Sequence, residues 1–100
     1  MGFDLNDNWR FDQPRNCAVL TLRQVLDGTE PILLVSHDLG DDGWQFIGSS
    51  DASFVDARVV SLEEMVNLDP TILVVSDLLP GLQAVRSGPG LAWRRRLRPA

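Results

Sequence analysis

The feature that most constrains the fold is a strand-like segment at residues 32–37, which begins with four consecutive branched apolar side chains. A continuous apolar segment is typical of a strand that is covered on both faces, so we expect it near the centre of a sheet. Residues 38–43 contain two glycines and three aspartates, and residues 44–48 resume a strand-like pattern. Because Gly40 and the Asp42-Gly43 pair tolerate the positive φ of a tight turn, the pattern predicts a β-hairpin.

The segment before this hairpin predicts a strand that passes into a short helix. Residues 17–22 are apolar and partly β-branched, which favours a strand. The apolar spacing from Leu22 onward is helical, so we expect a short helix that is capped by Thr21 and ended by Gly28.

Two helix-start signals follow a minimal third strand at residues 59–60. Ser61 and Glu64 match a capping box, in which each residue bonds the other's backbone amide. Asp69-Pro70 ends that helix and offers a second start, because proline is favoured at the first helical position. Residues 71–75 are ambiguous, since their composition favours a strand and the Asp-Pro pair before them favours a helical turn.

The C-terminal part predicts a last hairpin, or a strand followed by a loop, from residues 83–86 and 91–94 around a Gly-Pro-Gly turn. The chain has 100 residues, which is enough for one domain. We therefore expect an α+β fold in which a small antiparallel sheet of about four or five strands carries two or three short helices. The expected organisation is an extended N-terminal arm over residues 1–16, the α+β domain over residues 17–93 and an arginine-rich tail over residues 94–100.

The charge of the chain is strongly asymmetric. The net charge is −5, yet residues 91–100 carry four arginines and no acidic residue, while the rest holds all 14 acidic side chains. An acidic body repels phosphate backbones, so we expect no nucleic-acid partner. The tail has three alternatives: a disordered solvated segment, a phosphate- or RNA-binding segment, or one that pairs with the acidic body of its own or a neighbouring chain.

Other classes of site and location find little support in the sequence. No segment reaches the roughly 18–20 apolar residues that cross a bilayer, and the first residues lack the pattern of a signal peptide. We therefore expect a cytoplasmic protein with no membrane partner, in which Cys17 is reduced and buried as a small hydrophobic residue. One cysteine and one histidine predict neither a disulfide nor a structural metal site, and no cofactor motif is present.

The candidate site is the acidic loop of the first predicted hairpin. Asp38, Asp41 and Asp42 give it three carboxylates, and its simplest interpretation is a solvated loop with exposed acids. Each of the three tryptophans fits a core position, but an aromatic side chain at the rim of a surface can anchor a partner. Trp44, which directly follows the loop, is the first candidate for that role. His37 beside these carboxylates also has the composition of an acid–base pair, although no nucleophile motif accompanies it.

The order of several motifs resembles the immunity-protein-33-like bacterial family, described as domain of unknown function 2185, or a sister group of it. The matching residues are Cys17, Asp42-Gly43-Trp44-Gln45-Phe46, Val59-Val60-Ser61-Leu62, Asp69-Pro70-Thr71-Ile72 and Pro80-Gly81 with Ala84 and Arg86. The resemblance implies an α+β domain with an antiparallel sheet and a short helical segment after Asp-Pro, which is how we interpret residues 71–75. It also implies an antidote against a secreted toxin, and it supplies no catalytic residues.

Three functional hypotheses follow from the sequence. The first is a non-enzymatic protein-interaction module, in which Asp38, Asp41, Asp42 and Trp44 bind a basic toxin or another basic protein. The second is a small ligand-binding domain or enzyme that uses His37. The third is a structural homodimer that is joined by sheet edges or by arginine tails against acidic bodies.

Overall fold

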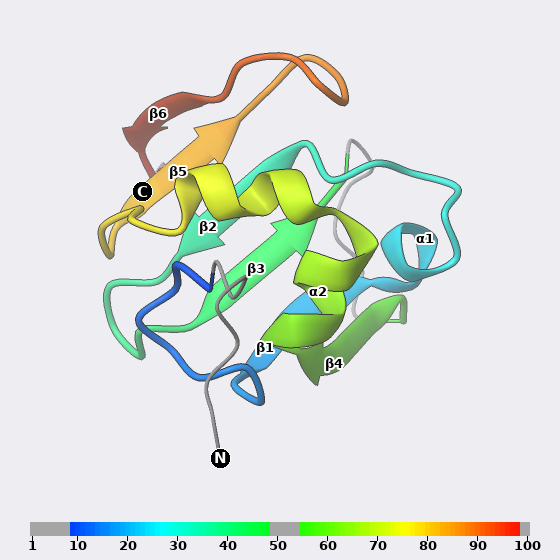
Figure 1. The fold of residues 1–100 in the computed structure, drawn as a ribbon, viewed down its shortest axis with the longest axis horizontal. Coiled ribbons are helices and arrows are strands. Elements are labelled where there is room, and N and C mark those ends of the chain that lie inside the picture. The colour runs from blue at the N-terminus through cyan, green and yellow to red at the C-terminus, as the bar shows by residue number, and fades with distance from the viewer. Residues whose placement is uncertain (1–8, 49–54, 99–100) are drawn as a thin grey trace, which may run out of the picture.

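Six strands form one sheet in the described part of the chain, which comprises residues 9–48 and 55–98 of a computed structural model (Figure 1). Their spatial order is β4-β1-β3-β2-β5-β6. The strands are β1 (Ala18–Leu22), β2 (Leu34–His37), β3 (Trp44–Ile47), β4 (Ala57–Ser61), β5 (Leu82–Val85) and β6 (Arg94–Leu97). The helices are α1 (Arg23–Leu26), α2 (Leu62–Leu68) and the 3₁₀ helix η1 (Pro70–Val75). The predicted α+β class is confirmed, and the sheet has more strands than expected.

The first predicted hairpin is confirmed and lies at the centre of the sheet. β2 pairs with β3 in antiparallel orientation, so that Val35 faces Phe46 and His37 faces Trp44. All four of these residues are buried. β5 pairs with the other edge of β2, which explains why the β2 sequence is apolar without interruption.

The sheet is mixed rather than wholly antiparallel, and this corrects the sequence prediction. β1 lies parallel to β3, with Leu20 opposite Gln45 and Thr21 opposite Phe46. The physical reason is the strand order, in which β3 lies between β1 and β2. β1 and β2 run in opposite directions, and β3 turns directly back from β2, so β3 runs parallel to β1. β4 then pairs antiparallel with the outer edge of β1.

Thr21 serves this parallel contact and does not cap α1 as predicted. Its hydroxyl donates a hydrogen bond of 2.6 Å to the carbonyl oxygen of Phe46, and the side chain is fully buried. The N-cap residue of α1 is Leu22, which makes no side-chain capping bond. Gly28 follows α1 with a φ of 83°, in agreement with its predicted role as a terminator.

Both predicted helix starts after β4 are confirmed. The Ser61 hydroxyl accepts a hydrogen bond of 3.1 Å from the Glu64 amide at the start of α2. The Asp69 carboxylate accepts one of 3.0 Å from the Thr71 amide, and η1 begins at Pro70. None of the helices found in residues 9–48 and 55–98 has the length and apolar character needed to span a membrane.

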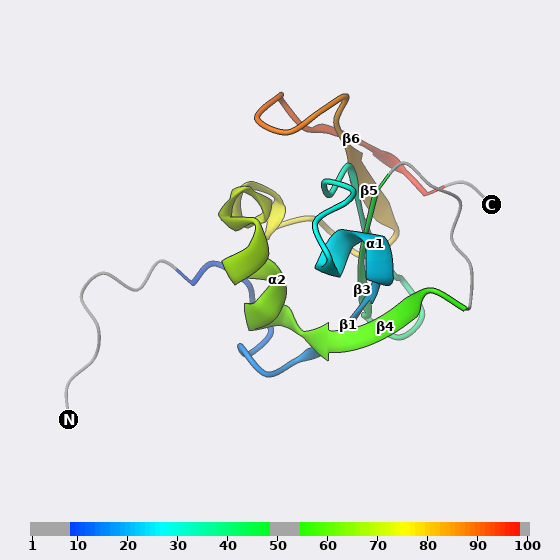
Figure 2. The same ribbon diagram turned by 90° about the vertical axis from the view of Figure 1, so that its right-hand side faces the viewer.

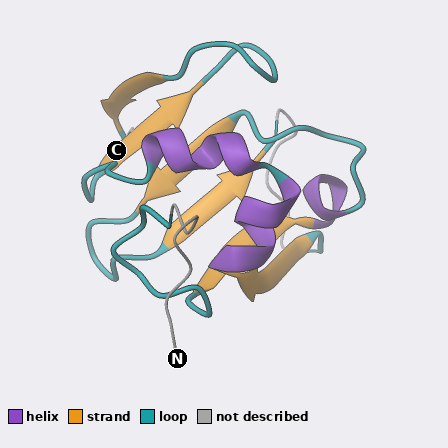
Figure 3. Cartoon of the chain, viewed as in Figure 1, coloured by secondary structure: helices purple, strands orange, loops and turns teal. Residues whose placement is uncertain are grey.

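The helices lie on one face of the sheet, and the core fills the space between these two layers (Figures 2 and 3). The sheet contributes Val19, Val35, Trp44, Phe46 and Ala84, which share one face by strand alternation. The helical layer contributes Val25, Leu62, Met65, Ile72, Leu73 and Val75. This packing fixes which ends of the strands, and which loops, remain at the surface.

The described part of the N-terminal segment packs against the domain rather than extending away from it. Phe11 is buried in the core, and Trp9 packs against that core. The Glu63 amide donates to the carbonyl oxygen of Arg15, which ties the segment to α2. Cys17 is half-buried, so the expectation of a buried thiol holds only in part. Residues 1–8 of the predicted arm lie outside the described residues.

The arginine-rich segment forms the last strand of the sheet instead of a tail beyond it. β6 pairs antiparallel with β5, with Ala84 opposite Arg95 and Leu82 opposite Leu97. Two arginines of the segment pair with acids of the same chain: Arg95 with Asp77, and Arg98 with Asp38. The boundary expected at residue 94 therefore does not separate domain from tail.

Candidate interaction site

The acidic loop between β2 and β3 has a defined backbone conformation. The Asp38 amide donates 2.8 Å to the Gly43 carbonyl oxygen, and the Asp41 carboxylate accepts a 2.9 Å hydrogen bond from the Gly43 amide. Asp42 has a φ of 60°, so the aspartate, and not the glycine after it, adopts the left-handed conformation. Aspartate tolerates this conformation better than most side chains because it can bond locally. The loop thus presents its carboxylates in fixed directions.

At one side of the loop, the buried ring of His37 contacts the exposed carboxylate of Asp42. The Nε2 atom of His37 lies 2.7 Å from Oδ1 of Asp42, and its Nδ1 atom lies 2.6 Å from the Leu78 carbonyl oxygen. A neutral imidazole has one N–H to donate, whereas the protonated ring can donate to both oxygens. Each ring nitrogen is therefore occupied by the protein, and the histidine joins β2, the acidic loop and the segment after η1.

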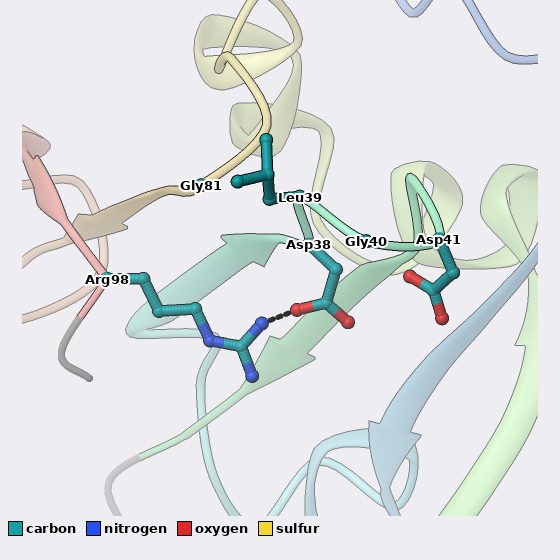
Figure 4. A pocket seen from close by; sticks show the side chains of 6 residues that line it. All are labelled: Asp38, Leu39, Gly40, Asp41, Gly81 and Arg98. Atoms are coloured by element: carbon teal, nitrogen blue, oxygen red, sulfur yellow. Dashed lines mark ion pairs between the residues drawn. The ribbon is translucent and has the colours of Figure 1, made fainter.

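Asp38 points to the opposite side of the loop and is not free. It forms an ion pair with Arg98 (Figure 4), and it accepts a 3.5 Å hydrogen bond from Gln45. Asp38 and Arg98 line a surface pocket of about 570 Å³ together with Leu39, Gly40, Asp41 and Gly81. The negative charge of Asp38 is thus balanced by Arg98, whereas Asp41 accepts a backbone hydrogen bond and has no ion-pair partner within the described residues.

Trp44 is buried, and this corrects the prediction of a rim aromatic. Its side chain is 2% exposed, stacks on His37 with ring centroids 4.0 Å apart, and meets Phe11 edge-on at 5.0 Å. Strand alternation places Trp44 on the same face as Phe46, and the helices cover that face. Trp44 thus supports the loop from below and offers no surface for a partner.

Two exposed leucines, which the sequence analysis did not single out, lie in the acidic loop and in the turn beside it. Leu39 is 76% exposed and Leu79 is 66% exposed. The Cβ of Leu39 lies 3.9 Å from where a Cβ on Gly81 would stand, so the loop contacts the turn that carries Leu79. A leucine in a turn, between Asp38 and Gly40, is the signal that sequence reasoning missed, because apolar side chains in turns seldom reach a core.

Further carboxylates surround these leucines. Asp12, Asp42 and Asp77 line a pocket of about 210 Å³ that also includes Leu79 and Pro80. Asp12, Asp41, Asp42 and Asp77 are all exposed. A hydrogen bond from Arg95, reinforced by its charge, lowers the pKa of Asp77, so this group is ionised. We call the surface formed by Leu39, Leu79 and these four aspartates the acidic end.

Several residues of the motifs on which the family resemblance rests lie together at a different place, where they stabilise the fold. The side chain of Arg86 is 1% exposed and donates to Asp69 at 2.7 Å, to Thr71 at 3.0 Å and to the Ile32 carbonyl oxygen at 2.9 Å. Trp93 covers the guanidinium at 4.2 Å. The Asp-Pro-Thr motif and Arg86 are thus parts of one structural network, which no spacing in the sequence indicated.

No group of three or more histidine, cysteine or acidic residues that could hold a metal ion occurs in the described residues. Comparison of the chain with protein-family models, with curated proteins and with solved structures gives no match. The acidic end brings carboxylates and leucines together on an exposed surface, where they can contact another molecule directly.

Proposed function

We propose that this chain is a non-enzymatic protein-interaction module whose acidic end binds a basic protein. The observation that carries this proposal is the grouping of exposed leucines and exposed carboxylates around one loop. Exposed apolar side chains supply the area that is buried on binding, and surrounding charges orient the partner and speed its association. A partner that fits has an apolar contact surface surrounded by lysine or arginine side chains.

The rigidity of the acidic loop supports the same proposal. Asp41 and Asp42 are held by bonds to Gly43 and His37, so little conformational freedom is lost when a partner binds. The resemblance to the immunity-protein-33-like family adds a specific form of the proposal, in which the basic partner is a secreted toxin.

The alternative of an enzyme that uses His37 has one observation in its favour, because the histidine lies beside a carboxylate at a pocket. Both ring nitrogens are bonded to protein oxygens, however, and the ring itself is stacked on Trp44. We therefore assign His37 the role of positioning Asp42 within the acidic end.

The test measures binding to the proteins that are encoded beside this chain's gene. Asp41→Asn/Asp42→Asn keeps oxygen atoms for the local hydrogen bonds and removes two charges. We expect it to slow association by several-fold at low salt, with the difference shrinking as salt is added. Leu39→Ser/Leu79→Ser should instead speed dissociation by about tenfold or more, because buried apolar contact is lost.

The matched control is Glu63→Gln/Glu64→Gln, which removes the same number of charges at the start of α2. It should leave both rate constants within about twofold of the wild type. Binding that responds equally to both pairs of charge changes would contradict the acidic end as the contact surface. Absence of binding to every one of these neighbouring proteins would contradict the proposal itself.

A further inference from the structure

Among residues 9–48 and 55–98, the last strand of the sheet has a row of backbone groups with no strand beside it. β6 lies at the end of the strand order (Figure 1). All four of its side chains are exposed. The Arg98 amide bonds to the Gly81 carbonyl oxygen, and hydrogen-bonded pairs alternate along an antiparallel ladder. The N–H and C=O groups of Arg95 and Leu97 therefore point away from β5, where they can pair with an added strand.

The side chains of this edge carry positive charge on the face away from the helices. Arg94 and Arg96 project from the same face, opposite Val85 and Gln83 of β5. Arg96 uses its Nε atom to donate to Gln83 at 3.1 Å, which leaves its terminal nitrogens available. Within the described residues Arg94 has no ion-pair partner. Arg95 points to the other face and is held by Asp77.

The same charges argue against pairing of this edge with a second copy of the chain. An antiparallel β6–β6 contact would place arginines of one copy next to arginines of the other, and like charges on adjacent strands are destabilising. An extended segment with carboxylates on one face has the opposite property, because each carboxylate can accept paired hydrogen bonds from a guanidinium.

We propose that β6 binds an extended acidic peptide segment, which adds as a seventh strand and places carboxylates at alternate positions against Arg94 and Arg96. The free amides of Arg95 and Leu97 supply the backbone pairing, and the two arginines supply the selectivity. The proposal concerns a different surface and an opposite charge from the acidic end, so it does not rest on the proposed function.

The experiment uses two labelled peptides of roughly eight residues, which is the length of an ordinary strand. In one, glutamate alternates with valine, and in the other the same glutamates form one block. Binding to the whole chain is measured by fluorescence anisotropy. We expect the alternating peptide to bind at least about tenfold more tightly, because only its carboxylates lie on one face of a strand.

Two pairs of variants separate charge from backbone pairing. Arg94→Glu should lower the affinity for the alternating peptide about tenfold. Arg10→Glu makes the same charge change at another exposed arginine and should change this affinity less than about twofold. Leu97→Pro removes one outward N–H, and proline is tolerated at a strand edge that faces solvent. Leu97→Pro should lower the affinity for the alternating peptide by a similar factor, whereas Leu97→Ala should leave it unchanged.

Two results would overturn the inference. Equal affinity for the two peptides would mean that the arginines attract negative charge without adding a strand. No binding of either peptide would mean that the arginines only protect the edge against aggregation. Because neither outcome involves the acidic end, the two proposals stand or fail separately.

Discussion

At the scale of single residues, Asp42 has two structural tasks that are visible together only in the structure. It adopts a left-handed backbone conformation, and its Oδ1 atom accepts a hydrogen bond from Nε2 of His37. Its second carboxylate oxygen accepts a 3.4 Å hydrogen bond from Gln13 of the N-terminal segment. The residue therefore fixes the shape of the acidic loop and connects it to two other parts of the chain.

We predict that Asp42→Ala lowers the free energy of unfolding by about 2 kcal/mol, from the lost hydrogen bond and from a side chain unsuited to positive φ. Asp42→Gly should cost less, since glycine relieves the backbone, and Asp42→Asn should cost least, since asparagine tolerates positive φ and keeps an acceptor. Urea denaturation of the three variants gives this order. Equal losses for alanine and asparagine would show that neither effect operates.

At the scale of elements, Arg86 joins parts of the fold that are distant in the sequence. It follows β5, and its guanidinium bonds to Asp69 and Thr71 at the start of η1 and to Ile32 before β2. The carboxylate of Asp69 thereby caps η1 and balances the buried charge at the same time. This one side chain holds the helical layer against the sheet.

We predict that Arg86→Lys lowers the free energy of unfolding by about 3 kcal/mol, because an ammonium group cannot match the planar fork of a guanidinium and leaves buried acceptors unpaired. Arg58→Lys is the control, since within the described residues Arg58 donates only to exposed carbonyl groups, and it should stay within about 0.5 kcal/mol of the wild type. Chemical denaturation measures both. A small loss for Arg86→Lys would show that solvent or a relaxed side chain replaces the network.

Local patterns predicted the elements whose determinants lie within a few residues. The central hairpin, the Ser61 cap and the helical turn after Asp69 each depend on neighbours in the sequence, and each is confirmed. The parallel contact of β1 with β3 depends on where the chain returns after α1, which no local spacing encodes.

The candidate site was predictable only in part, for a related reason. Strand alternation places Trp44 and Phe46 on one face, but which face the helices cover depends on packing against residues far along the chain. The three aspartates of the loop were identified, yet the pairing of Asp38 with Arg98 required the C-terminal segment to join the sheet. The leucines of the acidic end could not be predicted as site residues, because an isolated apolar residue in a turn belongs to no periodic pattern.

At the scale of the whole molecule, several carboxylates at or near the surface are ionised more readily in the folded chain than in the unfolded one. A hydrogen bond from Gln24, together with Arg23, lowers the pKa of Asp56 below its ordinary value near 3.8. Hydrogen bonds from Thr29 lower the pKa of Asp27, and Arg95 lowers that of Asp77. Since these folded-state pKa values are depressed, the associated stability is present above the unfolded pKa and is lost as the pH falls through the folded pKa.

We therefore predict that the melting temperature falls steeply below about pH 4 and that Asp56→Asn makes this fall shallower, because the variant has one less carboxylate to protonate. Thermal unfolding followed by circular dichroism between about pH 7 and pH 3 measures the effect. If the melting temperature falls equally steeply with decreasing pH in the variant and the wild type, Asp56 does not contribute to acid unfolding.

The contact of β1 with β3 has a consequence for the order in which the chain assembles. β2–β3 and β5–β6 are hairpins between strands that are close in the sequence, so each can form by closing a short loop. β1 comes first along the chain, yet it can take its place only beside a strand that is formed from much later residues. Because closing long loops costs entropy before any contact rewards it, we expect β1 and its partner β4 to dock late onto a preformed central hairpin. The earliest strand to be synthesised is then among the last to find its neighbours.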